Sequence, residues 1–254
     1  MSDANIQIHF PEFEIKHINN QRVILSKNLK KDVVLFIHGS PGSSIQFLLT
    51  DIPQRLINET NCSVVIIDRN GYGYSEFGLT DNISILASAE SISKVIGNFK
   101  DVERISIIGY SYGGPIAAAL ALLLENKTTS LVLISASVKP SAEKIFWFSK
   151  IISHKYICKM IPKIWLVANI EKLNHENYLK EFEGNWAAIK PKIICLHGNK
   201  DKLILVENTD YVKENAINSK EIIIILIKDA RHNILWDYPN RIFDALKANC
   251  FNYD

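Results

Sequence analysis

The sequence of 254 residues predicts an α/β protein with a mostly parallel, doubly wound sheet of about eight strands. Short runs rich in Val and Ile recur along the chain, and their nearly continuous apolar character is typical of strands buried on both faces. Longer amphipathic stretches separate these runs, and this alternation indicates βαβ units. The start of the chain differs, because two strand-like segments lie close together there and predict a hairpin at the sheet edge.

The predicted elements follow one another in a regular order. The edge hairpin is expected over residues 6–18 and 23–26. Six further strands are expected to end at Gly39, Asp68, Gly109, Ala136, Gly198 and Ile227. Apolar residues repeat at helical spacing between the strands, which predicts helices over residues 45–57, 83–96, 113–125, 207–217 and 234–248.

Residues 138–186 interrupt the alternation of strands and helices. Their apolar residues repeat with helical rather than strand spacing, and the segment holds three tryptophans, Trp147, Trp165 and Trp186. We therefore predict a helical cap over residues 138–186, inserted into a core formed by residues 1–137 and 187–254.

Composition and charge restrict the class of partner. Hydrophobic residues make up 47% of the chain and charged residues 22%, which is ordinary for a globular protein. The net charge is +2 and no long basic run occurs, so we expect no nucleic-acid partner. No apolar stretch is long enough to span a bilayer, so we expect no membrane insertion. A small molecule is the expected substrate, and the sequence does not predict the oligomeric state.

The cysteines and the first residues bear on the compartment. The four cysteines lie far apart without a C-x-x-C pair, so we expect neither a disulfide nor a metal site. The first residues lack the apolar segment of a secretory signal. The sequence therefore predicts a protein of the reducing cytoplasm.

A serine between two glycines is the first candidate for chemistry. Gly109-Tyr110-Ser111-Tyr112-Gly113 stands between a predicted strand and a predicted helix. This G-x-S-x-G pattern is typical of a nucleophile elbow, a sharp turn that exposes a serine hydroxyl and needs small residues on both sides. The turn would set Ser111 at a helix N-terminus, which favours developing negative charge. The alternative is that Ser111 is only a small turn residue.

A serine nucleophile requires a base and an acid that orients the base. His232 follows the last predicted strand, and Asp201 lies shortly after the strand that ends at Gly198. Both would reach the same carboxyl edge of the sheet as Ser111. Asp229 and Asp237 are too near His232 in the sequence to orient its ring from the opposite side. Solvated or turn-forming roles for His232 and Asp201 remain the alternatives.

These motifs together resemble the serine-nucleophile type of the α/β-hydrolase fold, in its esterase and proline-iminopeptidase-like branch. The resemblance rests on motifs spread over nearly the whole chain, at residues 38–42, 68–75, 109–114, 197–203 and 229–233. Two positions depart from the usual pattern: Asn70 stands where proline is common, and no glycine precedes the histidine region. The resemblance implies a catalytic triad of Ser111, Asp201 and His232 in the order usual for this fold.

The resemblance also implies an oxyanion hole and a reaction. The backbone N–H groups of Ser40 and Tyr112 would hold the oxyanion, and an acyl-enzyme would form and be hydrolysed without metal or organic cofactor. The apolar residues of the cap favour a small carboxylic ester as substrate. The candidate pocket residues are His38, Tyr110, Trp147 and Trp165.

Three other functions stay open. A proline-iminopeptidase-like aminopeptidase would need carboxylates to bind the substrate amine, but the glutamates of the cap are expected to lie on a solvated face: Glu171, Glu176, Glu181 and Glu183. Hydrolysis of a C–C bond is a second alternative. A non-catalytic, ligand-binding protein is a third, because fold does not determine function.

Overall fold

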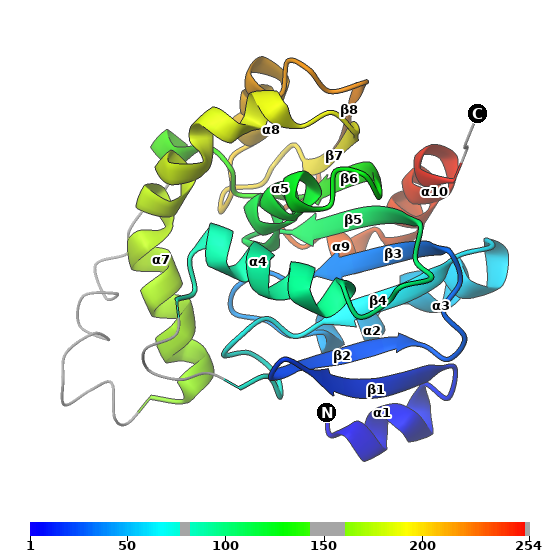
Figure 1. Ribbon diagram of the computed structural model, residues 1–254. Coiled ribbons are helices and arrows are strands. Elements are labelled where there is room, and N and C mark those ends of the chain that lie inside the picture. The colour runs from blue at the N-terminus through cyan, green and yellow to red at the C-terminus, as the bar shows by residue number, and fades with distance from the viewer. Residues whose placement is uncertain (77–81, 143–160, 252–254) are drawn as a thin grey trace.

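The computed structural model describes residues 1–76, 82–142 and 161–251 (Figure 1). Its centre is one eight-stranded sheet with the strand order β1-β2-β4-β3-β5-β6-β7-β8. The strands are β1 (Phe13–Ile18), β2 (Gln21–Ser26), β3 (Asp32–Ile37), β4 (Ser63–Ile67), β5 (Arg104–Tyr110), β6 (Thr128–Ile134), β7 (Lys192–Gly198) and β8 (Ile222–Ile227).

The sheet is mostly parallel, as the sequence predicts. All neighbours from β4 to β8 in the sheet order run parallel, whereas β1 and β2 form an antiparallel hairpin that continues antiparallel to β4. Strands β3, β5, β6 and β7 therefore end at one edge of the sheet, and the loops after them share that edge.

The first part of the predicted hairpin is wrong, because a helix, α1 (Asp3–His9), precedes β1. The Ser2 hydroxyl accepts a hydrogen bond from the Asn5 N–H at 3.4 Å and caps the helix. In a strand, Ile6 and Ile8 would lie on the same face and both would be buried. In the structure Ile6 is buried whereas Ile8 is 71% exposed. One helical turn buries Ile6 and accounts for the pattern equally well.

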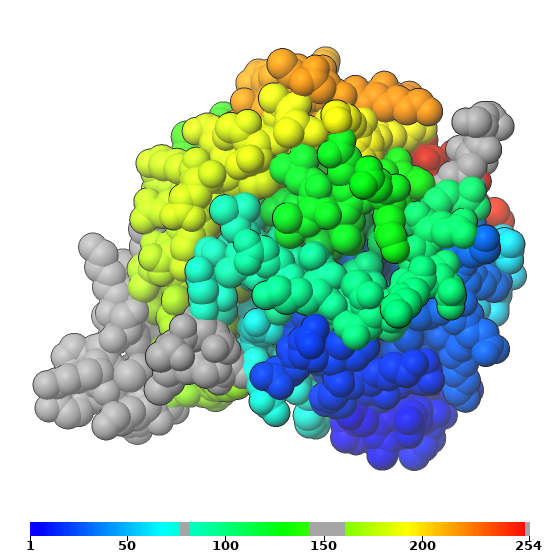
Figure 2. Space-filling model, in the orientation of Figure 1, coloured from blue at the N-terminus to red at the C-terminus, as the bar shows by residue number. Residues whose placement is uncertain are grey.

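Helices cover both faces of the sheet (Figure 1). Apolar residues of α4 (Ile85–Ile96), α5 (Gly113–Leu123) and α8 (Glu207–Asn215) form one core with the sheet. Residues of α3 (Ile52–Glu59) and α10 (Pro239–Cys250) form the other. In the space-filling view the atoms of α4 and α5 form a continuous surface across the middle of the molecule (Figure 2).

Two predicted helices are each divided in the structure. The segment 45–57 forms α2 (Ile45–Leu48) and α3, and the segment 234–248 forms α9 (Ile234–Asp237) and α10. Proline stands in the first turn of both α3 and α10. Because proline lacks the N–H that would continue the backbone hydrogen bonds of a preceding helix, neither segment forms one unbroken helix through Pro53 or Pro239, where periodicity predicts one.

The predicted cap contains η1 (Pro140–Ala142), the long helix α7 (Lys163–Phe182) and η3 (Glu183–Ala188), while residues 143–160 lie outside the described residues. Helix α7 buries Val167, Leu179 and Phe182 and packs against α4. Figure 1 shows α7 standing at one side of the sheet. The division into core and cap stays a prediction. Within the described part of the chain, every helix is too short or too polar to cross a bilayer.

Candidate active site

The turn after β5 has the geometry that a nucleophile elbow requires. Ser111 has a φ of 52°, in the left-handed region that costs energy for a non-glycine residue. A Cβ added to Gly109 would lie 2.5 Å from the Gly113 carbonyl oxygen, and one added to Gly113 would lie 2.7 Å from that of His38. Both glycines are therefore required by close backbone contacts. Helix α5 begins directly after Tyr112, as the sequence predicts.

Asp201 and His232 are brought together after β7 and β8. Asp201 Oδ1 accepts hydrogen bonds from the N–H groups of Leu203 and Ile204, both at 2.9 Å. Asp201 Oδ2 lies 2.7 Å from His232 Nδ1, which donates to it when the carboxyl is ionised. Burial alone would raise the pKa of Asp201, but the hydrogen bond and charge of His232 and the Ile204 N–H together lower it. This arrangement leaves Nε2 as the basic nitrogen of His232.

Several contacts connect His232 to the neighbourhood of Ser111. The rings of Tyr110 and His232 have centroids 5.5 Å apart. The Ser135 hydroxyl donates to the His232 carbonyl oxygen at 3.2 Å, and the Ser137 N–H donates to that of Ser111 at 3.2 Å. Among the described residues no hydrogen bond joins the Ser111 hydroxyl to His232. The hydrogen bond between Asp201 and His232 is thus observed, whereas their roles as acid and base and their link to Ser111 stay predictions.

The loop after β3 lies beside the elbow. A Cβ added to Gly39 would be 3.1 Å from Ser111 Cβ, so residues 38–42 border the candidate nucleophile. Within the described residues, the N–H groups of Ser40 and Tyr112 donate no hydrogen bond. Tyr112 precedes the first turn of α5, where backbone N–H groups have no helical partner. Both donors are thus unengaged in the part of the chain that the structure describes, and their role as an oxyanion hole stays a prediction.

His38 is a buried residue rather than an exposed pocket residue. Its exposed fraction is 0%, its Nε2 accepts a hydrogen bond from the Arg69 N–H at 3.0 Å, and its Nδ1 donates to the Gly39 carbonyl oxygen at 2.8 Å. Burial, together with the positive charge of Arg69, lowers the pKa of His38 well below its ordinary value. We therefore assign to the neutral ring of His38 the role of holding the loop.

The other candidate pocket residues differ in exposure. Tyr110 is buried, and its ring packs between those of His232 and Trp236, with centroids 5.5 and 5.4 Å away. Trp165 is 54% exposed on α7. Trp147 lies outside the described residues. Tyr110 thus packs against the His232 ring, and among the described candidate pocket residues only Trp165 presents a large surface to solvent.

Glu171 on α7 does not lie on a solvated face, which corrects that expectation. It is 1% exposed, and its carboxylate is bound by Arg69 at 2.5 Å and by the Tyr72 hydroxyl at 2.6 Å. A signal for this burial exists in the sequence: Glu171 lies four residues after Val167 and eight before Leu179, both buried on α7. Helical spacing places all three on one face.

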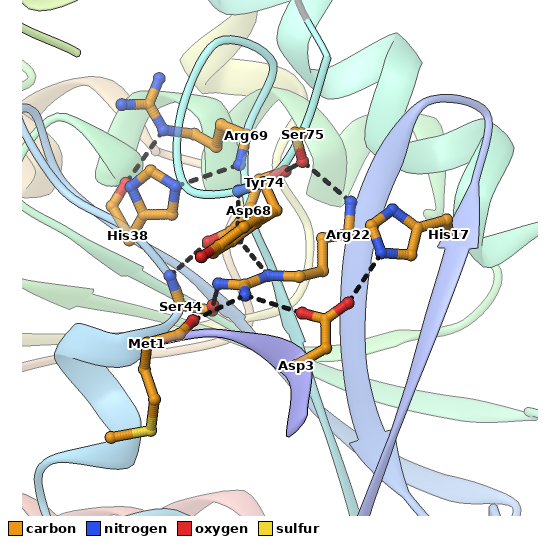
Figure 3. A network of polar contacts seen from close by, with 10 residues as sticks. All are labelled: Met1, Asp3, His17, Arg22, His38, Ser44, Asp68, Arg69, Tyr74 and Ser75. Carbon is orange, nitrogen blue, oxygen red and sulfur yellow. Dashed lines mark hydrogen bonds and ion pairs between the residues drawn. The ribbon is translucent and has the colours of Figure 1, made fainter. Parts of the chain in front are cut away.

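Asp68 and Arg69 are adjacent in the sequence but bind different partners. Asp68 accepts hydrogen bonds from Arg22 Nε and the Ser44 N–H, both at 2.6 Å. In Figure 3, Asp68 faces Arg22 and Ser44, whereas Arg69 turns to His38. The buried Arg22–Asp68 pair joins β2 to the turn after β4, and the sequence analysis did not identify Arg22.

No group of three or more His, Cys, Asp or Glu side chains suited to a metal ion occurs among the described residues.

The sequence is similar to that of a known family with this kind of fold. A family model described as the alpha/beta hydrolase fold matches residues 32–155. A proline iminopeptidase of Thermoplasma volcanium is 28% identical over 106 residues, which are 41% of this chain and 34% of that protein. The chain covers 36%, 60% and 34% of the lengths of three curated relatives that it matches.

Solved structures are similar over nearly the whole chain. A Vigna radiata epoxide hydrolase mutant has a TM-score of 0.74 at 13% identity, with 96% of this chain and 100% of that chain covered. The esterase EaEST of Exiguobacterium antarcticum has a TM-score of 0.68 at 18% identity, covering 93% and 97%. At such identities the likeness concerns the fold. The chain has the α/β-hydrolase fold.

Proposed function

We propose that the protein is a serine hydrolase that acts on small carboxylic esters. Ser111 attacks the ester carbonyl while His232 Nε2 accepts its proton, and Asp201 holds the imidazole and stabilises its protonated form. The N–H groups of Ser40 and Tyr112 bind the oxyanion. The alcohol leaves with the proton from His232, and water then hydrolyses the acyl-enzyme with His232 again as the base.

One observation supports this proposal most directly, namely the 2.7 Å hydrogen bond between Asp201 Oδ2 and His232 Nδ1. It fixes the tautomer that leaves Nε2 free to accept a proton. The acid is itself held by two backbone N–H groups, so the ring has a defined orientation. Tyr110, which packs on this ring, directly precedes Ser111. A histidine with a purely structural role would not need this oriented acid.

The engagement of two cap carboxylates, Glu171 and Glu176, favours an ester over a peptide amine as substrate. An aminopeptidase needs a free carboxylate for the substrate ammonium, but Glu171 is bound to Arg69 and Tyr72. Glu176 is paired with Lys180 on the helix surface. The likeness to a proline iminopeptidase keeps aminopeptidase activity as the second candidate.

Hydrolysis of p-nitrophenyl acetate and butyrate tests the proposal. In Ser111→Ala we expect kcat to fall by about 10⁴-fold or more, because the nucleophile is gone. Ser130→Ala is the matched control, since it removes a buried hydroxyl from β6 away from the elbow. A fluorophosphonate probe should label Ser111, as read by mass spectrometry of the digested protein.

Three results would contradict the proposal. Equal rates for the wild type and Ser111→Ala would leave a non-catalytic, ligand-binding protein as the better interpretation. Faster turnover of prolyl or alanyl p-nitroanilides than of the esters would favour the aminopeptidase. Turnover of a vinylogous diketone in preference to both would favour C–C bond hydrolysis.

A further inference from the structure

Beyond the proposed triad, the geometry points to Glu171 as a positioning residue that holds Ser40 through Arg69 and Tyr72 and so aims the Ser40 N–H at the oxyanion. The consequence for catalysis rests on the proposed function. The anchoring of Ser40 by a helix far away in the sequence is a separate statement, and it is tested separately below.

The first connection runs through the peptide between Gly39 and Ser40. Arg69 Nη2 donates to the Gly39 carbonyl oxygen at 3.1 Å, and His38 Nδ1 donates to the same oxygen at 2.8 Å. This carbonyl and the Ser40 N–H belong to one planar peptide, so holding the oxygen also sets the direction of the N–H. Donation to the carbonyl also polarises the peptide, which strengthens the N–H as a donor.

Glu171 in turn holds the guanidinium of Arg69. Arg69 Nη1 lies 2.5 Å from Glu171 Oε1, and Nη2 lies 3.3 Å from Oε2, so the contact is bidentate. Arg69 Nε donates to the His38 carbonyl oxygen at 3.1 Å. Burial alone would lower the pKa of Arg69, but the carboxylate of Glu171 more than offsets this and raises it. The guanidinium therefore stays charged and has little rotational freedom.

The second connection runs through the Ser40 side chain. Tyr72 donates its hydroxyl proton to Glu171 Oε2 at 2.6 Å, and the Ser40 and Tyr72 hydroxyl oxygens are 2.8 Å apart. Because the Tyr72 proton is engaged by the carboxylate, Ser40 donates to Tyr72. Burial and the negative charge of Glu171 raise the pKa of Tyr72, which keeps this proton in place. Hydrogen bonds thus connect both the peptide and the hydroxyl of Ser40 to Glu171, the first through Arg69 and the second through Tyr72.

The two connections have a mechanical consequence. Glu171 is a residue of α7, whereas Ser40 lies in the loop after β3. A displacement of α7 would move the Arg69 guanidinium and the Tyr72 hydroxyl together, and both contact Ser40 or its peptide. An oxyanion donor acts at full strength only at the correct distance and angle, so the position of α7 affects the rate of the chemical step.

Two variants and one control test this inference. Glu171→Gln removes the carboxylate charge, and Tyr72→Phe removes only the hydroxyl while the ion pair and ring remain. Glu176→Gln is the matched control on α7, since Glu176 pairs with Lys180 on the surface. The readouts are kcat and KM for p-nitrophenyl butyrate, and amide hydrogen exchange of the segment 38–44 in the whole protein.

We expect kcat to fall about tenfold in Tyr72→Phe and about a hundredfold in Glu171→Gln, with KM changed less than about threefold. Exchange of the segment 38–44 should become faster in both variants and stay unchanged in Glu176→Gln. A role limited to stability would lower the melting temperature but leave kcat per titrated active site unchanged.

Three results would overturn the inference. Unchanged exchange in both variants would show that Glu171 does not anchor Ser40, whatever the protein catalyses. Faster exchange with unchanged kcat would exclude a positioning role. A higher kcat in Glu171→Gln would mean that the charge of Arg69, rather than the geometry of Ser40, controls the oxyanion. If Ser111→Ala is as active as the wild type, the proposed function alone fails, and the exchange measurement still decides whether Glu171 anchors Ser40.

Discussion

At the scale of single residues, the tautomer of His232 depends on the hydrogen bond that Asp201 accepts from its ring. The carboxylate has one oxygen committed to two backbone N–H groups and the other to His232 Nδ1. An amide in its place would present its oxygen to the backbone donors and its NH₂ group to the ring. The ring would then accept at Nδ1 and carry its proton on Nε2, the tautomer that cannot deprotonate Ser111.

We therefore expect Asp201→Asn to lower kcat for p-nitrophenyl esters by about 10⁴-fold, with the protein still folded. The matched control is Asp229→Asn. Asp229 is exposed, pairs with Lys200 and has a φ of 60°, which asparagine tolerates. Steady-state kinetics of both variants measure the effect. A decrease of less than tenfold in Asp201→Asn would mean that Asp201 does not set the tautomer of the base.

At the scale of elements, the packing of α5 against β3 depends on the absence of one side chain. A Cβ on Gly113 would press against the carbonyl oxygens of Ile37 and His38, which are backbone atoms and cannot rotate away. Gly184 is the opposite case, because a Cβ there would meet nothing within 4 Å. Comparing substitutions at these two glycines therefore distinguishes the cost of a close contact from the general effect of replacing a glycine.

We expect Gly113→Ala to lower the free energy of unfolding by about 1–3 kcal/mol, because helix and strand must move apart. Gly184→Ala should be neutral or stabilise slightly, since it restricts the unfolded chain. Urea unfolding followed by circular dichroism measures both. Equal stabilities of the two variants would show that β3 and α5 accommodate the added methyl group without cost.

The strands are the elements that the sequence predicts best. The runs of Val and Ile in β3 to β7 are buried on both faces, and this produces a nearly continuous apolar signal, while the edge strand β8 is only part-buried. Helix boundaries are predicted less well, because Pro53 and Pro239 divide periodic segments whose apolar spacing continues across the break. The helix at Asp3–His9 is mistaken for a strand because so short a segment fits either period.

At the scale of the whole molecule, the candidate site was predictable in part. Ser111, Asp201 and His232 each follow a recognisable strand, so their common edge follows from the parallel sheet. The contact between Arg69 and Glu171 joins positions 102 residues apart and depends on how α7 lies against the core. Periodicity along α7 places Glu171 on a buried face but does not identify its partner.

The stability of the whole fold depends on pH through the protonation of its buried histidines. Burial is the largest cause that lowers the pKa of both His38 and His197. In the unfolded chain a histidine titrates near pH 6.5, so below this pH the unfolded state binds more protons than the folded state. The stability from these neutral rings is fully present above about pH 6.5 and is lost as pH falls toward the lowered pKa values. Asp201 affects the pH dependence of stability only at lower pH. Its ordinary pKa is near 3.9 and its pKa in the folded state is lower, so the stability that it provides is lost only as pH falls below about 3.9.

The free energy of unfolding should therefore decrease between pH 7.5 and 5.5, by about 1.4 kcal/mol for His38 alone. Urea titrations at the two pH values measure this decrease. His38→Asn should be less stable at pH 7.5, but its decrease should be smaller than that of the wild type by about this amount, because an amide does not titrate. His9→Gln, on the exposed face of α1, is the control and should keep the full decrease. An identical decrease in His38→Asn and the wild type would mean that the buried ring takes up its proton without unfolding the protein.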